Sequence, residues 1–199
     1  MVRFAQPQPR CRTCALPLPA GIMQCGECLR SAPPLDACLA AVSYSYPWSD
    51  LILSYKFNSK PEWSATFALL LRSTPWVEPA LERADVLVPM PLSKQRLQER
   101  GFNQALELAR QLAPDKTEGA LLLRIKDTPP QSALRRSDRL RNVKGVFAID
   151  PLRSAALRGK QVVLVDDVMT SGASLFAAAL ALRQAGAASV TGVVLARTE

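Results

Sequence analysis

The stretch that decides the fold is residues 161–175, QVVLVDDVMTSGASL. Four apolar, mostly β-branched residues lead into two carboxylates, Asp166 and Asp167, and a short polar turn at 170–174 precedes an apolar segment with helical spacing. A short continuous apolar run of this kind is typical of a buried strand in a parallel sheet. The stretch therefore predicts a strand, a loop and the start of a helix.

The predicted loop has the chemistry of a phosphate site. Thr170, Ser171 and Ser174 supply hydroxyls, the small residues let backbone N–H groups approach an anion, and the dipole of a helix N-terminus favours negative charge. Asp166 and Asp167 could hold ribose hydroxyls directly or through a hydrated magnesium ion. A sugar phosphate would fit between the acidic pair and the loop.

Three other interpretations of this stretch are open. It could be an ordinary buried strand and capped helix, part of a phosphate-accepting receiver domain, or part of a nucleotide hydrolase. The chain contains no GxxxxGK[ST], and T-S-G follows the acids within one loop, which argues against the last two.

Length and composition limit the classes of protein. A chain of 199 residues can form one α/β core with a small appendage. The net charge of +8, from 25 Lys+Arg against 17 Asp+Glu, suggests anionic partners. With no histidine, imidazole catalysis and His-ligated metal sites are excluded. Without a membrane-spanning apolar run or a signal-peptide core, we expect a cytoplasmic protein, or one held at the inner face of the membrane by partners.

Four cysteines near the N-terminus form two CxxC pairs, Cys11 with Cys14 and Cys25 with Cys28. This spacing predicts a structural zinc ion with four thiolate ligands, because the segment between the pairs is too short to bury a core. The alternative is a disulfide or a redox-active CxxC. Cys38 is expected to be a small buried residue. We predict a zinc ribbon at 1–34 and an α/β domain at 35–199, joined at Pro33 and Pro34.

Between the cysteines and the decisive stretch, the pattern predicts alternating strands and helices. The expected strands are 39–47, 85–91, 121–125 and one ending at Phe147. Helices are expected from Pro47, over 62–72, over a segment with an apolar stripe from Phe102 to Leu112 that follows the polar residues 93–100, and over 131–142. A helix with Leu175 and Leu182 on one face and a strand at 189–195 complete a βαβ unit, which implies parallel strands. The sequence predicts an α/β fold with a parallel sheet flanked by helices.

Basic residues supply the remaining candidates. Arg96 and Arg100 lie near the carboxyl end of the strand at 85–91, where open α/β sheets bind ligands, although they could be a solvated pair. Lys56 and Lys60 are expected to be solvated rather than to bind a phosphate. The predicted basic helix at 131–142 carries four arginines, Arg135, Arg136, Arg139 and Arg141. It could contact nucleic-acid phosphates, close over a polyphosphate, or simply face solvent.

Taken in order, these motifs resemble one family. The two CxxC pairs, Y-K-F at 55–57, V-P-M-P at 88–91, R-G-F-N-Q at 100–104, Gln131 with R-L-R-N at 139–142, and V-D-D-V-M-T-S-G-A-S at 165–174 are similar to the ComF family of competence-associated, type I phosphoribosyltransferase-like proteins. The last motif alone resembles the phosphoribosyl pyrophosphate (PRPP) motif of that superfamily.

The resemblance implies a PRPP site and a type I phosphoribosyltransferase-like sheet. It implies that the acidic pair lies at the ribose, that the turn at 170–174 holds the 5′-phosphate, and that pyrophosphate lies near the turn after Val88, where Pro89 and Arg100 are candidates. The residues so implied for PRPP with Mg²⁺ are Pro89, Arg100, Asp166, Asp167, Val168, Met169, Thr170, Ser171, Gly172, Ala173 and Ser174.

Two functions follow from the resemblance. One is a PRPP-binding protein of natural transformation that handles single-stranded DNA after import, with competence or other DNA-processing proteins as partners. The other is an active phosphoribosyltransferase that uses an unidentified base, with Asp166 and Asp167 as catalytic residues and charge stabilisation in place of imidazole chemistry. No base-recognition hood is evident in the sequence, which favours the first function.

Overall fold

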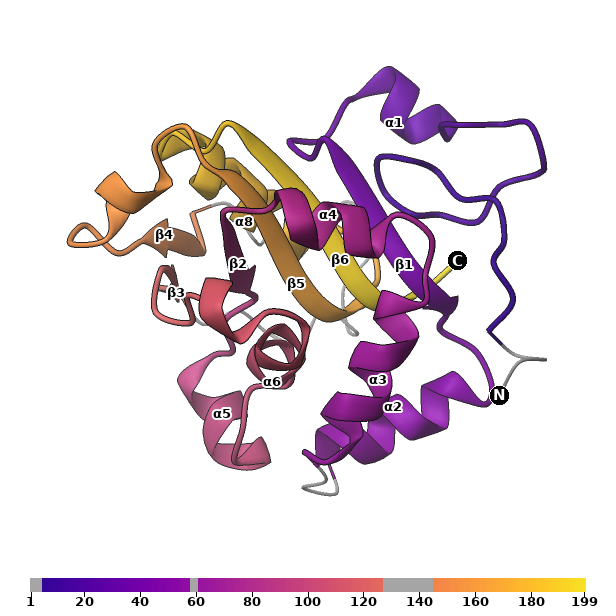
Figure 1. The fold of residues 1–199 in the computed structure, drawn as a ribbon, viewed down its shortest axis with the longest axis horizontal. Helices are drawn as coiled ribbons and strands as arrows, with labels where there is room; N and C mark the ends of the chain where they lie inside the picture. Colours follow the sequence, from indigo (N-terminus) through magenta and orange to yellow (C-terminus); the bar gives the residue numbers. More distant parts are fainter. Residues whose placement is uncertain (1–4, 58–60, 127–144) are drawn as a thin grey trace.

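The computed structural model describes residues 5–57, 61–126 and 145–199. Its centre is a four-stranded parallel sheet of strand order β1-β6-β5-β2, with helices on both faces (Figure 1). The strands are β1 Ala37–Ser43, β2 Val86–Pro89, β3 Leu122–Arg124, β4 Phe147–Ile149, β5 Gln161–Met169 and β6 Ser189–Arg197. The helices are α1 Gly26–Arg30, α2 Trp48–Phe57, α3 Trp63–Arg72, α4 Val77–Arg83, α5 Lys94–Arg100, α6 Gln104–Leu112 and α8 Ala173–Gln184, with 3-10 turns η2 Pro114–Lys116 and η4 Ser154–Leu157.

Strand β5 occupies an interior position in the sheet, because it pairs with β6 on one side and β2 on the other. Its apolar residues alternate between two cores. Val162 and Leu164 pack on the face covered by α8, whereas Val163 and Val165 pack on the opposite face. Burial on both sides explains why the run is apolar without interruption, as the sequence predicted.

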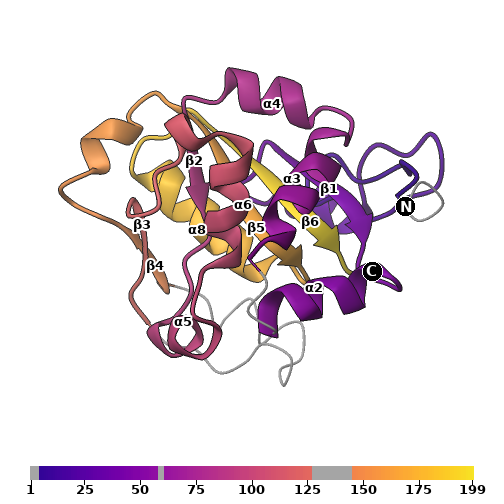
Figure 2. The same ribbon diagram turned by 60° about the horizontal axis from the view of Figure 1, so that its bottom comes forward.

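The helices divide between the two faces of the sheet. Helices α2, α3, α4 and α6 cover one face with buried side chains that include Ile52, Phe67, Leu71 and Leu108. Helix α8 covers the other face, and Figure 2 shows it on the far side of the sheet from α3 and α6. The predicted apolar face of α8, at Leu175, Ala178, Ala179 and Leu182, is fully buried.

Three expectations about local structure need correction. Strand β5 runs through Asp166 and Asp167 to Met169, because β6 continues beside it and pairs Met169 with Arg197. Strand β4 begins at Phe147, where a strand end was expected, and pairs with β3 in a separate antiparallel sheet. Helix α4 lies where no element was predicted, and it contains Pro79. Proline is tolerated there because it lies in the first helical turn.

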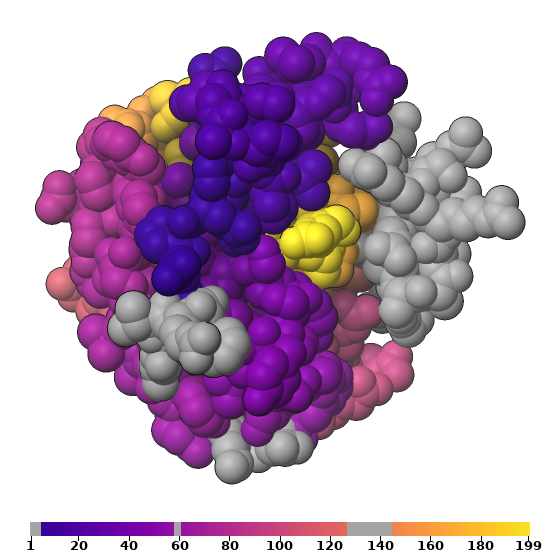
Figure 3. Space-filling model, turned by 90° about the vertical axis from the view of Figure 1, so that its right-hand side faces the viewer, coloured from indigo at the N-terminus to yellow at the C-terminus, as the bar shows by residue number. Residues whose placement is uncertain are grey.

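The N-terminal part of the chain packs along β1, an edge strand of the main sheet, with hydrogen bonds from Cys38 to Arg12 and from Arg10 to Ser43. In Figure 3 the N-terminal residues (indigo) lie beside the C-terminal residues (yellow) on one face of the molecule. The domain boundary at residue 34 stays a prediction, and the predicted basic helix at 131–142 lies outside the described residues. Among the helices of the described residues, none is long and apolar enough to cross a membrane.

Candidate functional site

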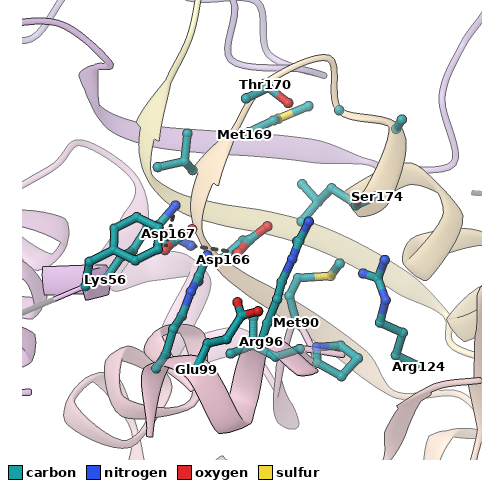
Figure 4. A pocket seen from close by; sticks show the side chains of 18 residues that line it. Lys56, Met90, Arg96, Glu99, Arg124, Asp166, Asp167, Met169, Thr170 and Ser174 are labelled. Atoms are coloured by element: carbon teal, nitrogen blue, oxygen red, sulfur yellow. Dashed lines mark hydrogen bonds and ion pairs between the residues drawn. The ribbon is translucent and has the colours of Figure 1, made fainter. Parts of the chain in front are cut away.

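A cavity of about 420 Å³ opens at the carboxyl ends of β2 and β5 (Figure 4). It brings together residues that are far apart in the sequence: an acidic pair from β5, the loop into α8, and cations from three other elements. The polar and loop residues that line it are Lys56, Arg96, Glu99, Arg100, Arg124, Asp166, Asp167, Thr170, Gly172, Ala173 and Ser174. Ligand sites of open α/β sheets lie at this edge of the sheet.

The two carboxylates have different surroundings. Asp166 Oδ1 accepts a hydrogen bond of 2.9 Å from the backbone N–H of Asp167. Burial, followed by the charge of Asp167, raises the pKa of Asp166 to about 7, although Lys56 and Arg100 oppose the shift. Near neutral pH, a divalent cation or another positive charge would therefore have a strong effect on the ionisation of Asp166.

Lys56, at the end of α2, is the cation nearest to the acidic pair. Its Nζ lies 3.0 Å from Asp167 Oδ2, and its side chain is only 16% exposed. Asp167 Oδ2 is buried, and besides this ion pair no described residue donates a hydrogen bond to it. The expectation that Lys56 is solvated was therefore wrong. A buried acceptor of this kind fits a magnesium ion or a ribose hydroxyl.

The β5–α8 loop, residues 170–172, brings the chain from the acidic pair to the N-terminus of α8. Gly172 precedes the helix with a φ of +82°, and a Cβ there would lie 2.6 Å from Met169 Cε and 2.7 Å from Phe176 Cζ. Only glycine fits this turn. Thr170, Gly172, Ala173 and Ser174 line the cavity, so the N-terminus of α8 lies beside it, which suits an anionic group.

Helix α5 carries two arginines of the site, Arg96 and Arg100, and β3 carries the third, Arg124. Ser93 caps α5, and Asn103 both caps α6 and donates to the carbonyl of Met90 at 3.1 Å, which ties the two helices to the end of β2. Arg100 donates to Gln104 Oε1 at 2.8 Å, while its buried Nε has no hydrogen-bond partner among the described residues. In Figure 4, Arg96 and Arg124 extend toward the end of the cavity where Ser174 lies.

Most of the PRPP-site residues expected from the sequence line this one cavity. Asp166, Asp167, Val168, Met169, Thr170, Gly172, Ala173, Ser174 and Arg100 all do so. Ser171 and Pro89 do not, since Pro89 is a buried residue of β2 paired with Val165. Arg135, Arg136, Arg139 and Arg141 lie outside the described residues. Sequence reasoning missed Lys56 and Arg124, because only the tertiary fold brings α2 and β3 to the loop.

The four cysteines of the two CxxC pairs come together at a second site. The sulfurs of Cys11, Cys14, Cys25 and Cys28 all lie within 4.8 Å of one another, and all four residues are buried. Four thiolates at this separation could hold one metal ion, and the all-sulfur set is consistent with tetrahedral zinc. Cys38 is buried outside this group, with its Sγ 3.6 Å from Met169 Sδ.

A second cavity, of about 550 Å³, lies between the N-terminal segment and helices α3 and α4. Its lining includes Met23, Trp76 and Arg12, and none of its described lining residues is acidic. It therefore lacks the oxygen ligands that a magnesium-bound phosphate requires.

Comparison with known proteins agrees with this arrangement. Residues 97–199 match the phosphoribosyl transferase domain family. DNA utilization protein YhgH of Salmonella typhimurium is 32% identical over 94% of this chain and 84% of its own length. Competence protein F of Haemophilus influenzae is 31% identical over 95% and 85%, and Competence protein ComFC of Bacillus subtilis is 40% identical over 57% and 45%. The chain therefore belongs to the ComF-like family of proteins with a phosphoribosyltransferase-type domain.

Proposed function

We propose that the protein binds PRPP with Mg²⁺ in the cavity at the carboxyl ends of β2 and β5. The observation that carries the proposal is the meeting of an acidic pair, a helix N-terminus and four cationic side chains around one cavity. Asp166 and Asp167 would hold the ribose hydroxyls and magnesium, and the β5–α8 loop would hold the 5′-phosphate. Lys56, Arg96, Arg100 and Arg124 would face the pyrophosphate.

Calorimetric titration tests this proposal. We expect saturable binding of PRPP with Mg²⁺ to the wild type, and at least a hundredfold weaker binding to the double variant Asp166→Ala with Asp167→Ala, because each lost charged hydrogen bond costs about 1.5–3 kcal/mol. Asp85→Ala is a control, since Asp85 is an exposed carboxylate that pairs with Lys160 away from the cavity. Equal affinity of the double variant and the wild type would refute the site.

We further propose that PRPP binding serves the handling of imported single-stranded DNA in natural transformation. The proposal is supported by the names of the relatives, which refer to competence and DNA utilization, and by the net charge of +8. Replacing Arg135, Arg136 and Arg139 with Ala should weaken single-strand binding and flatten its salt dependence. An unchanged salt slope would exclude these arginines as phosphate contacts.

The second candidate function is transfer of phosphoribosyl to a base. It is favoured by Phe57, which lies at the cavity with 60% of its surface exposed and the guanidinium of Arg100 at 5.2 Å from its ring centroid, and which could stack with a base. Release of pyrophosphate from PRPP on addition of one base from a panel of purines and pyrimidines would establish the transferase. Tight PRPP binding without pyrophosphate release from any base would favour the binding function.

A further inference from the structure

Arg197, the last residue of β6, connects the cysteine site to the β5–α8 loop. Its side chain is buried, with 4% exposed. Its Nε donates to the carbonyl of Cys14 at 2.9 Å, and its Nη1 donates to the carbonyls of Met169, at 3.3 Å, and of Thr170 and Thr198. One guanidinium thus joins a cysteine of the metal cluster to the first residues of the loop.

Among the described residues, no Asp or Glu oxygen lies within ion-pair distance of the Arg197 guanidinium. A buried cation without a counter-charge is costly. Arg10 lies close by, bonded to the Ala15 carbonyl at 3.1 Å and to Ser43 Oγ.

The cysteine site can supply the missing negative charge. Four thiolates around one divalent ion carry a net charge of −2, from four negative charges and two positive ones. Both cations donate to backbone carbonyls at the end of the first CxxC pair: Arg197 donates to Cys14 and Arg10 donates to the next residue, Ala15. A metal-loaded cluster would therefore fix both cations by charge as well as by hydrogen bonds.

A second contact runs in parallel with Arg197. The backbone N–H of Cys38 donates to the carbonyl of Arg12 at 2.8 Å, and Cys38 Sγ packs against Met169 Sδ. Two residues, Arg197 and Cys38, therefore connect the segment of the first cysteine pair to the end of β5. Figure 3 shows the N-terminal and C-terminal residues side by side on one face of the molecule.

We propose that Arg197 is a positioning residue that couples metal binding at the four cysteines to phosphate binding at the β5–α8 loop. With the metal bound, the Cys14 carbonyl and the thiolate charge hold the guanidinium, which in turn holds the carbonyls of Met169 and Thr170 so that the following N–H groups face the cavity. Without the metal, the counter-charge is lost and the loop loses this support. This proposal rests on the proposed function for the identity of its ligand, PRPP. If the metal strengthens PRPP binding by a given factor, linkage requires PRPP to strengthen metal binding by the same factor.

The test compares PRPP affinity, with Mg²⁺ present, between zinc-loaded and zinc-stripped full-length protein by calorimetry. We expect zinc removal to weaken PRPP binding by about fivefold or more in the wild type, the lower range of measured couplings. In Arg197→Lys the affinity should be low and nearly independent of zinc, because a lysine ammonium cannot bridge carbonyls on both sides. Arg72→Lys is the matched control, since Arg72 also joins two segments, through Glu78 and the Leu112 carbonyl.

Two results would overturn the coupling. One is a PRPP affinity that does not change when zinc is removed from the wild type. The other is an equal loss of affinity on zinc removal in the wild type and in Arg197→Lys, which would show that zinc acts without Arg197. Circular dichroism of each zinc-stripped sample establishes that the sheet is retained.

Hydrogen exchange separates this inference from the proposed function. If zinc-loaded wild type does not bind PRPP, the proposed function fails, but the structural coupling predicts faster amide exchange at residues 169–174 when zinc is removed, with or without PRPP. If Arg197→Lys does not fold, amide exchange at residues 169–174 of the wild type, with and without zinc, tests the coupling in its place. Unchanged exchange at 169–174 would overturn the inference by itself.

Discussion

The cysteine segment, residues 11–28, and the β5–α8 loop both present polar groups at defined positions, but different interactions hold them. The loop continues a strand that is paired on both sides and buried on both faces. The cysteine segment has one helix of five residues, and its apolar side chains Ile22 and Met23 are largely exposed. The hydrophobic core therefore positions the strand that leads into the loop, whereas the segment would depend on a metal ion held by its four cysteines.

Loss of the metal ligands should give the largest effect. In Cys25→Ser with Cys28→Ser we expect metal content to fall from about one ion per chain to almost none, and the melting temperature to fall by on the order of 10 °C, because the segment has no core of its own. Metal analysis and calorimetry provide the two measurements. Cys38→Ala is the control and should keep its metal, whereas a double variant that still binds zinc would contradict the ligand assignment.

Gly172→Ala tests how strictly the core fixes the loop. The added Cβ meets Met169 and Phe176 in a backbone conformation of positive φ, so we expect a loss of about 3 kcal/mol in the free energy of unfolding and at least about tenfold weaker PRPP binding. Gly159→Ala is the matched control, since Gly159 also has a positive φ but nothing lies within 4 Å of its Cβ position. We expect the free energy of unfolding of Gly159→Ala, measured in urea, to fall by only about 1 kcal/mol. Equal losses would contradict the packing argument.

Lys56→Gln tests the cation beside the acidic pair. We expect PRPP affinity to fall by about tenfold, or about 1.4 kcal/mol, because a largely buried charge is removed from a site for a polyanion. Lys160→Gln is the control, since it removes an exposed Lys–Asp pair with a similar separation, 3.2 Å, on another part of the surface. If titration shows the same affinity for both variants and the wild type, Lys56 does not face the ligand.

The pH dependence of stability gives the smallest expected effect. The pKa of Asp166 is about 7 in the folded protein, above the value of an unfolded aspartate, so the folded state binds more protons between about pH 4 and pH 7. The free energy of unfolding should therefore fall as pH rises through this range. We expect Asp166→Asn to be more stable than the wild type above pH 7, with the difference shrinking toward pH 4, in urea titrations without magnesium. A difference that is the same at pH 5 and pH 8 would contradict the assignment.

Local sequence patterns predicted the core of the fold and most of the site. The apolar run of β5, the buried face of α8 and the two CxxC pairs each depend on residues close together in the chain, and the structure has all three. The end of β5 was misplaced because pairing with β6 extends it, and sequence periodicity does not record which strands are neighbours.

Residues that reach a site from other elements could not be found in this way. Lys56 lies at the end of α2 and meets Asp167 only through tertiary packing. Arg197 follows an ordinary strand pattern, and its four carbonyl partners come from three separate parts of the chain. A buried cation at the end of a strand is a weak signal, and no spacing rule connects it to the cysteines.

The most direct test of the central claim is nuclear magnetic resonance of the zinc-loaded, ¹⁵N-labelled protein titrated with PRPP and magnesium. The account predicts that the backbone amides of residues 170–174 shift most, because their N–H groups would donate to the 5′-phosphate, while amides of residues 21–23 beside the second cavity stay in place. Largest shifts at residues 21–23, or no shifts at 170–174 at saturating PRPP, would contradict the claim that this cavity binds PRPP.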